Sequence, residues 1–161
     1  MSGSVLEVET RSPEETERLG AALAAMLDRG TVVALYGDLA AGKTCFVRGM
    51  ASRFGAAESV HSPTFTLVNE YGDDPKLQHV DLYRLSGPEE VEDLGCADFL
   101  EGPGICAVEW AERAEGLMPG RRVEIRFEHA GEDRRRIAIH DHDVLPGDWE
   151  VALKRAVGNP S

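Results

Sequence analysis

The chain contains Gly37-Asp38-Leu39-Ala40-Ala41-Gly42-Lys43-Thr44, which fits the phosphate-binding pattern of two glycines separated by four residues and followed by Lys and Thr. The glycines let the backbone turn back so that successive N–H groups point at one phosphate, and Lys43 reaches the terminal phosphates. Thr44 would give its hydroxyl to Mg²⁺. We therefore predict a nucleotide-binding P-loop with a solvent-facing Lys43. A glycine-containing surface turn beside an ordinary lysine is the alternative.

The residues on either side of this stretch favour the P-loop. Residues 31–36 form a short apolar run that stops at Gly37, as expected of a buried parallel strand that feeds the loop. Residues 45–54 carry apolar side chains at helical spacing, and Gly55 supplies a left-handed stop. Strand, loop and helix thus follow in the order that points the helix N-terminus at the phosphates.

Size, charge and cysteine usage limit the class of protein. We expect one domain spanning residues 1–161, with one core. The formal charge of −12, from 29 acidic and 17 basic residues, disfavours tight direct binding of nucleic acid. No signal-peptide pattern or long apolar run is visible, so we expect a cytoplasmic protein. Cys45, Cys96 and Cys106 lack metal-site spacing and are expected to be reduced thiols, with Cys106 in the core.

Periodicity and turn signals predict the remaining elements. Ser12-Pro13-Glu14-Glu15 is a capping box that begins an amphipathic helix closed by Gly30. The other predicted elements are a hairpin of residues 65–71 and 78–83, a short helix at 88–94, a buried strand at 105–108, a hairpin of 122–128 and 134–140, and a helix at 148–157. The order predicts an α/β protein with the single-domain P-loop NTPase fold: a central mixed β-sheet flanked by helices, with antiparallel hairpins.

Two carboxylates lie where phosphoryl transfer needs them. The apolar run 105–108 ends in Glu109, the expected place for an acid that holds Mg²⁺ or its water. Asp81 lies on an alternating strand and could hold water next to the metal or orient the nucleophile. Surface acids at strand ends are the alternative for both. His61 and His79 flank this region, where each either hydrogen-bonds within the site or has a structural role.

Five motifs in order resemble the TsaE (YjeE) family. They are T-x-x-L-G, G-D-L-x-A-G-K-T, S-P-T-F-T-L-V-N-E-Y, H-x-D-L-Y-R-L and I-C-x-V-E-W-A-E, between Thr16 and Glu112. Members are small bacterial ATPases needed to make threonylcarbamoyladenosine at position 37 of tRNAs that read codons beginning with A. The resemblance implies that TsaD and TsaB are the partners and that ATP hydrolysis is slow alone and faster in their complex. Because the chain is too acidic to attract tRNA by itself, we expect it to reach tRNA only through these partners.

The resemblance also implies roles for residues. Thr44 and Glu109 would hold Mg²⁺, and Asp81 would take part in hydrolysis beside the metal. Ser62-Pro63-Thr64 would form a switch-like loop over the γ-phosphate.

Two further residues are implied to lie near the nucleotide, and two depart from the family pattern. Trp110 would sit close to the nucleotide, and Arg135, identified by its R-x-I pattern, would contact the nucleotide.

Ala40 stands where members usually carry Gly and requires a backbone conformation that a side chain tolerates. Cys45 stands where members usually carry Thr and places a weaker hydrogen-bonding thiol near the α-phosphate.

Two polar runs near the C-terminus are interpreted as solvent-exposed segments rather than as binding sites. His140-Asp141-His142-Asp143 has metal-binding side chains, but neighbouring positions at a strand end face opposite ways, so we interpret it as a solvated turn. Arg134-Arg135-Arg136 could form a phosphate clamp, but a strand exposed beside Glu132-Asp133 is the preferred interpretation of the run as a whole.

Other functions stay open at this point. A small-molecule P-loop kinase would use the same loop and Mg²⁺, although a chain of this length leaves little room for an acceptor domain. An adapter that binds ATP with negligible hydrolysis is a non-enzymatic alternative. A GTPase is disfavoured because the chain has no N-K-x-D motif.

Overall fold

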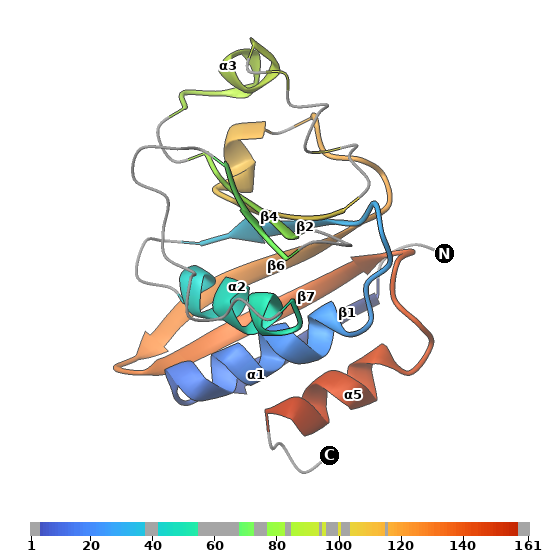
Figure 1. The fold of residues 1–161 in the computed structure, drawn as a ribbon. Helices are drawn as coiled ribbons and strands as arrows, with labels where there is room; N and C mark the ends of the chain where they lie inside the picture. Colours follow the sequence, from blue (N-terminus) through green and yellow to red (C-terminus); the bar gives the residue numbers. More distant parts are fainter. Residues whose placement is uncertain are drawn as a thin grey trace.

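Seven strands form one mixed sheet in the order β1-β7-β6-β2-β5-β4-β3, with helices on both of its faces (Figure 1). This arrangement confirms the predicted α/β fold with a central mixed sheet. The computed structural model describes residues 4–37, 42–54, 68–72, 77–82, 85–93, 95, 100, 104–114 and 116–157.

The centre of the sheet is parallel. β2 (Val32–Tyr36) lies between β5 (Ile105–Glu109) and β6 (Arg122–Gly131) and runs parallel to both. β4 (Leu77–Asp81) is the parallel neighbour on the far side of β5. The first four residues of β2 and all of β5 are buried, as their apolar sequences predicted. The carboxyl ends of β2, β5 and β4 therefore meet at one edge of the sheet.

The outer strands are antiparallel. β3 (Val68–Tyr71) pairs with β4, and β7 (Arg134–His142) pairs with β6, so both predicted hairpins are confirmed where the structure describes them. The C-terminal hairpin is longer than predicted. β7 also pairs with β1 (Ser4–Thr10), an edge strand that the sequence analysis did not include.

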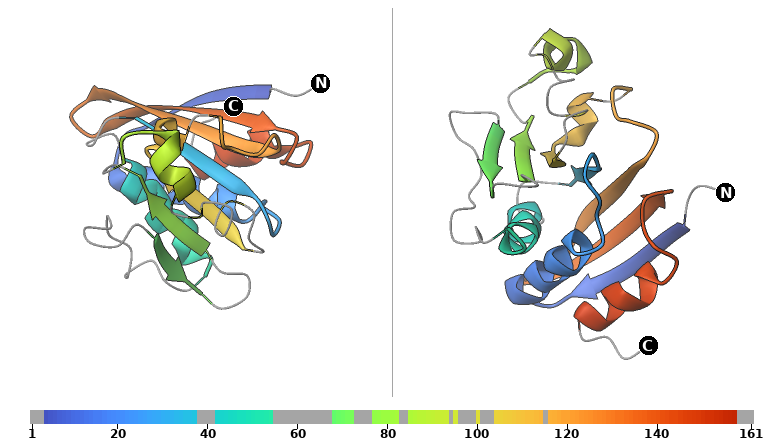
Figure 2. Two further views of the ribbon diagram at one scale, coloured as in Figure 1. Left: turned by 90° about the horizontal axis from the view of Figure 1, so that it is seen from above. Right: turned by 45° about the vertical axis from the view of Figure 1, so that its right-hand side comes forward.

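Among the helices that the structure describes, three cover one face of the sheet and two short ones cover the other. α1 (Pro13–Ala24), α2 (Lys43–Ser52) and α5 (Trp149–Ala156) pack together beneath the strands (Figures 1 and 2). α3 (Pro88–Asp93) and the 3₁₀ helix η2 (Ala111–Ala114) pack on the opposite face. Each face therefore has its own apolar core, and Cys106 belongs to the second, where burial raises the pKa of its thiol to about 12.

The predicted N-cap Ser12 at the start of α1 is confirmed, but Glu15 bonds back to the residue before the N-cap rather than to Ser12 itself. Ser12 Oγ accepts a hydrogen bond from the Glu15 N–H at 3.1 Å, and Glu15 Oε1 accepts one from the Arg11 N–H at 2.9 Å. The predicted end at Gly30 is wrong, because α1 ends at Ala24. The Gly30 N–H instead donates to the Gly104 carbonyl at 2.8 Å, which ties this turn to the chain entering β5.

Two glycines let α1 and α2 approach backbone to backbone. A Cβ on Gly20 would lie 2.1 Å from the Phe46 carbonyl oxygen, and one on Gly49 would lie 1.9 Å from the Glu17 carbonyl oxygen. Any side chain larger than hydrogen at either position would push the helices apart. These two close contacts fix the position of α2 relative to α1.

Candidate functional site

The helix that follows the P-loop starts as the sequence predicted. α2 begins at Lys43, directly after Gly42, whose φ of 98° is in the left-handed region that glycine adopts without strain. Gly42 is the N-cap and brings no side chain, so the first N–H groups of α2 face the loop and suit an anion. Residues 38–41 of the predicted loop lie outside the described residues, so Asp38, Leu39, Ala40 and Ala41 stay predictions.

Lys43 does not face solvent, which corrects the sequence-based expectation. Its side chain is 2% exposed. Its Nζ donates to the Gly37 carbonyl at 2.6 Å and lies 4.0 Å from the centre of the Trp110 ring. The long apolar stem packs while the ammonium is attracted by the carbonyl and the ring face, which a sequence pattern does not reveal. The positive charge is therefore held at the carboxyl edge of the sheet.

The two predicted carboxylates lie side by side at that edge. Asp81 and Glu109 are paired positions in the parallel register of β4 and β5, and Glu109 is also paired with Leu35 of β2. The side chains of paired positions point to the same face of the sheet. Leu35 belongs to the core between the sheet and the helices α1 and α2. Glu109 is 3% exposed, so it is not a surface acid. Both carboxylates thus lie on the side of the sheet from which α2 starts.

His79 holds one of these carboxylates. It is fully buried in β4, and its Nε2 lies 2.5 Å from Glu109 Oε2. Its Nδ1 is also buried and has no hydrogen-bond partner within the described ranges. Of the two uses considered for this histidine, the structure supports a hydrogen bond within the site. His61 lies outside the described residues.

Trp110 turns the chain at the end of β5. Its φ of 59° is in the left-handed region, which is unusual for a bulky residue, and such strained backbone clusters at functional sites. The turn places the ring near two cations, since the Lys43 Nζ is 4.0 Å and the Arg113 Cζ 5.5 Å from the ring centre. The ring therefore borders the P-loop lysine.

Arg135 reaches the P-loop from the C-terminal hairpin. Its Cγ and Nε lie 3.7 and 3.8 Å from the position that a Cβ on Gly42 would take. Its Nη1 donates to the carbonyls of Glu132 and Arg134 at 2.8 and 2.9 Å. Its Nε is buried and has no hydrogen-bond partner among the described residues. One donor of a permanently charged group is thus held beside the start of α2, where Cys45 lines the same hollow.

The flanking arginines point elsewhere. Arg134 and Arg136 are exposed, and they pair with Glu9 and Glu128 on the neighbouring strands. Alternation along β7 explains the difference, because positions 134 and 136 face away from the side that Arg135 faces. Residues 134–136 therefore form neither a single phosphate clamp nor a strand whose side chains are all exposed.

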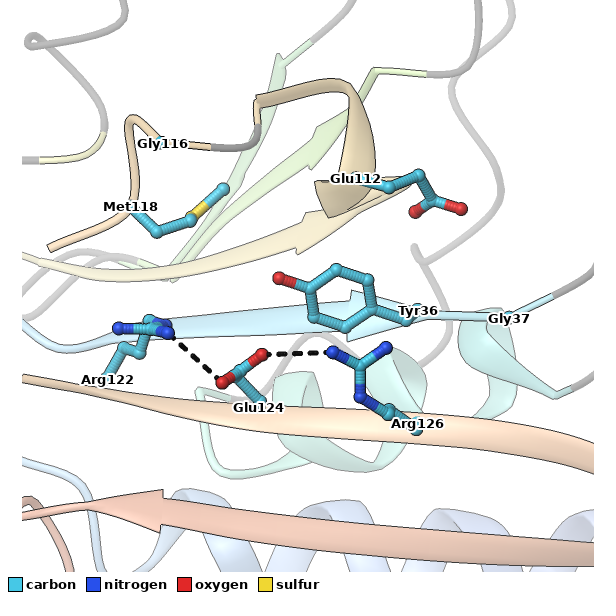
Figure 3. Close-up of a pocket in the computed structure, with 8 residues that line it drawn as sticks. All are labelled: Tyr36, Gly37, Glu112, Gly116, Met118, Arg122, Glu124 and Arg126. Carbon is cyan, nitrogen blue, oxygen red and sulfur yellow. Dashed lines mark hydrogen bonds and ion pairs between the residues drawn. The ribbon is translucent and has the colours of Figure 1, made fainter. Parts of the chain in front are cut away.

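A second polar region lies on the opposite face of the sheet. A cavity of about 530 Å³ is lined there by Tyr36 and Gly37, by Glu112, Gly116 and Met118, and by Arg122, Glu124 and Arg126 (Figure 3). Glu124 lies between the two arginines and is bonded to both, at 3.1 and 3.4 Å. Burial raises the pKa of Glu124, but the hydrogen bond with His142 and the two arginines outweigh it and leave the pKa below its usual value.

Two histidines near the C-terminus lie close to Glu124, which lines this cavity. His140 and His142 lie in β7 rather than in a solvated turn, which corrects the preferred interpretation of that run. Asp141 does face the other way, as predicted, and is buried, where its Oδ1 accepts the N–H groups of Val144 and Leu145 at 2.8 and 3.0 Å. The prediction missed the partner of the histidines, since Glu124 is remote in sequence and comes close only through the register of β6 and β7.

Among the described helices, none combines the length and apolar character needed to cross a bilayer. The predicted switch-like loop, Ser62-Pro63-Thr64, lies outside the described residues.

Comparisons with known proteins point to one family. The sequence model of the family described as "Threonylcarbamoyl adenosine biosynthesis protein TsaE" matches residues 10–137. The tRNA threonylcarbamoyladenosine biosynthesis protein TsaE of Bacillus subtilis (strain 168) is 43% identical over 135 residues, which cover 83% of this chain and 84% of the relative. The protein of the same name from Treponema pallidum (strain Nichols) is 40% identical over 130 residues, which cover 81% and 96%.

A solved structure agrees with these relatives. The crystal structure of Bacillus subtilis YdiB superposes with a TM-score of 0.73 at 32% sequence identity, covering 97% of this chain and 96% of that chain.

Proposed function

The chain belongs to the TsaE family, and from that premise we propose that it is a Mg²⁺-dependent P-loop ATPase that takes part in forming threonylcarbamoyladenosine in tRNA. The observation that carries the ATPase proposal is the pairing of Asp81 with Glu109 on the side of the sheet from which α2 starts. A nucleotide held by the N-terminus of α2 would have its terminal phosphate next to these carboxylates.

The residues present fit a magnesium ion. The Thr44 hydroxyl in the first turn of α2 and the carboxylates of Asp81 and Glu109 are all oxygen donors, which Mg²⁺ prefers. Glu109 is buried and held by His79, so its carboxylate is already oriented. When bound, Mg²⁺ would neutralise charge on the phosphates.

The remaining residues take complementary roles in this proposal. Lys43 supplies positive charge to the terminal phosphates, close to its present position beside Gly37. Asp81 orients the attacking water, and Trp110 borders the nucleotide. Gly42 and the first N–H groups of α2 cradle the phosphates, together with residues 37–41 and Cys45.

Arg135 is proposed to contact the nucleotide, which gives a prediction with internal controls. Arg135→Ala should weaken ATP and ADP binding by roughly 10- to 100-fold, because a charge-assisted hydrogen bond contributes about 1.5–3 kcal/mol. Arg134→Ala and Arg136→Ala remove the same charge from the other face of β7 and should leave the affinity within about twofold. Calorimetric titration measures all three. Equal losses for the three variants would show that only overall charge matters.

The family and the charge of the chain support a proposal about its partners. We propose that the protein binds the TsaD–TsaB complex and couples its ATP hydrolysis to the turnover of that complex. A chain with a formal charge of −12 repels a polyanion, so contact with tRNA is delegated to those partners. Ser62-Pro63-Thr64, as a loop ordered by the γ-phosphate, would change the surface offered to a partner after hydrolysis.

Reconstitution tests this proposal. We expect slow ATP hydrolysis by the protein alone, no change with tRNA alone, and faster hydrolysis with its own TsaD and TsaB. Stimulation by tRNA alone would contradict the proposal, as would no stimulation under conditions where the three proteins co-purify. Single-turnover measurements also separate the alternatives: an adapter would bind ATP without hydrolysing it in any mixture, and a kinase would pass the phosphoryl group to an acceptor other than water.

A further inference from the structure

Glu124, His140 and His142 form a cluster on the face of the sheet opposite to α2. We propose that they bind a divalent transition-metal ion, with Zn²⁺ as the ion that fits best. One ligand atom from each residue lies within 4.8 Å of the others. This cluster shares no residue with the P-loop site, so the inference does not depend on the proposed ATPase activity.

The register of the C-terminal hairpin builds the cluster. Glu124 of β6 is paired directly with His140 of β7, and His142 lies two residues further along the same strand. Positions two apart on a strand face the same way, so both imidazoles point to the side that carries the Glu124 carboxylate. The two rings lie 4.1 Å apart, and His142 Nε2 is 2.5 Å from Glu124 Oε1. The three ligands thus come from rigid strands rather than from a loop.

The surroundings hold the carboxylate in place. Glu124 is 7% exposed, and Arg122 and Arg126 bind its two oxygens at 3.1 and 3.4 Å (Figure 3). A carboxylate offers about four lone-pair positions, so these contacts leave acceptor capacity for an ion. These hydrogen bonds fix the orientation of the carboxylate, which favours ligation, while the two guanidinium charges oppose it.

The metal ion would replace the hydrogen bond between His142 and Glu124. Zinc binds imidazole nitrogen and carboxylate oxygen at about 2.0–2.2 Å, so the two atoms, now 2.5 Å apart, would separate by roughly an ångström. The side chain of Arg126 is 63% exposed, so it can swing away from the added charge by giving up its contact with the Tyr36 ring, whose centre is 4.3 Å from its Cζ. The adjoining cavity has room for water as a fourth ligand.

The donor set selects the class of ion. Two imidazoles and one carboxylate suit Zn²⁺, Ni²⁺ and Cu²⁺, whereas Mg²⁺ prefers oxygen ligands alone. A bound ion would clamp β6 to β7 and so stabilise the folded state over the unfolded chain. Zinc binding should therefore appear as a rise in melting temperature that Mg²⁺ does not produce.

Thermal unfolding and calorimetric titration of the nucleotide-free protein with ZnCl₂ test the proposal. We expect one equivalent of Zn²⁺ to bind and a concentration of 100 times the dissociation constant to raise the melting temperature by about 5–10 °C. MgCl₂ at the same concentration should leave it unchanged. His140→Ala and His142→Ala should each weaken Zn²⁺ binding by at least about 100-fold, because each removes a direct ligand.

Two controls address other zinc ligands. His129→Ala removes an exposed histidine from β6, and Cys45→Ser removes a thiol that is only partly buried; both should bind Zn²⁺ like the original chain. If His142→Ala unfolds, His142→Gln keeps a hydrogen-bonding side chain beside Glu124 and serves in its place. No Zn²⁺ binding by the original chain, or binding undiminished in both histidine variants, would overturn the proposal.

Discussion

Replacing Lys43 by alanine should weaken ATP and ADP binding by roughly 30- to 4,000-fold. Removing the charged partner of a buried phosphate contact typically costs about 2–5 kcal/mol. Calorimetric titration measures the change directly. The structure alters how this experiment must be read, because Lys43 is 2% exposed and packs against Trp110, so the alanine variant also loses packing.

A second variant separates charge from packing at this position. Lys43→Met keeps an apolar stem against the Trp110 ring and removes only the ammonium, so it should lose nucleotide affinity as alanine does while unfolding near the original temperature. Lys154→Ala, in α5, is the matched control and should bind nucleotide normally. Undiminished nucleotide binding by a folded Lys43 variant would remove the P-loop assignment.

Asp81→Asn and Glu109→Gln should each lower ATP turnover by about 100-fold or more while nucleotide still binds. Both changes keep the shape of the side chain and remove its charge from the place where the terminal phosphate and Mg²⁺ are proposed to lie. Single-turnover hydrolysis gives the rate, and titration with ADP shows that the phosphate cradle is intact. Glu109→Gln also replaces the carboxylate that is hydrogen-bonded to His79 by an amide.

The chain supplies matched controls for these two substitutions. Asp93→Asn and Glu92→Gln make the same chemical changes on the exposed surface of α3 and should leave turnover unchanged. Wild-type rates in both Asp81→Asn and Glu109→Gln would mean that the paired carboxylates are structural. Loss of ADP binding in either variant would show that it damages the cradle rather than the chemistry.

Local patterns predicted most of the elements that surround the site. The strand before Gly37, the helix after Gly42 and the strand that ends at Glu109 each have a distinctive run of apolar residues, and all three are observed. The capping box at Ser12 is also a local signal, because its bonds join residues three or four positions apart. These features depend on neighbours in sequence, which is why a single chain was enough to predict them.

Features that depend on remote contacts were missed or misjudged. β1 gains its place only by pairing with β7 at the far end of the chain. Lys43 is buried because a turn after β5 brings Trp110 over it. The two histidines of β7 gain a carboxylate only through the register with β6. No pattern within a short window encodes any of these contacts.

The position of β7 in the sheet also places the side chains of residues 134–136 on different faces. The sequence offered the run as a clamp or as an exposed strand, and proposed Arg135 from the family pattern alone. In the structure Arg135 lies beside Gly42 and its two neighbours lie on the other face. Which arginine faces the loop depends on which side of β7 faces the helices, a choice that alternation alone leaves open.

The order of strands in the sheet also sets when a chain of this kind can fold as it leaves the ribosome. β2 and α2 are synthesised early, but the two strands that pair with β2 are β5 and β6, which are synthesised later. β1 likewise pairs with β7, near the end of the chain. Such remote pairings carry a large entropy cost before any contact repays it, so they form slowly and late. We therefore expect that a nascent chain which has exposed residues 37–44 has no assembled nucleotide site until translation has passed the C-terminal hairpin. Until then its apolar strands remain open to chaperones and to neighbouring chains.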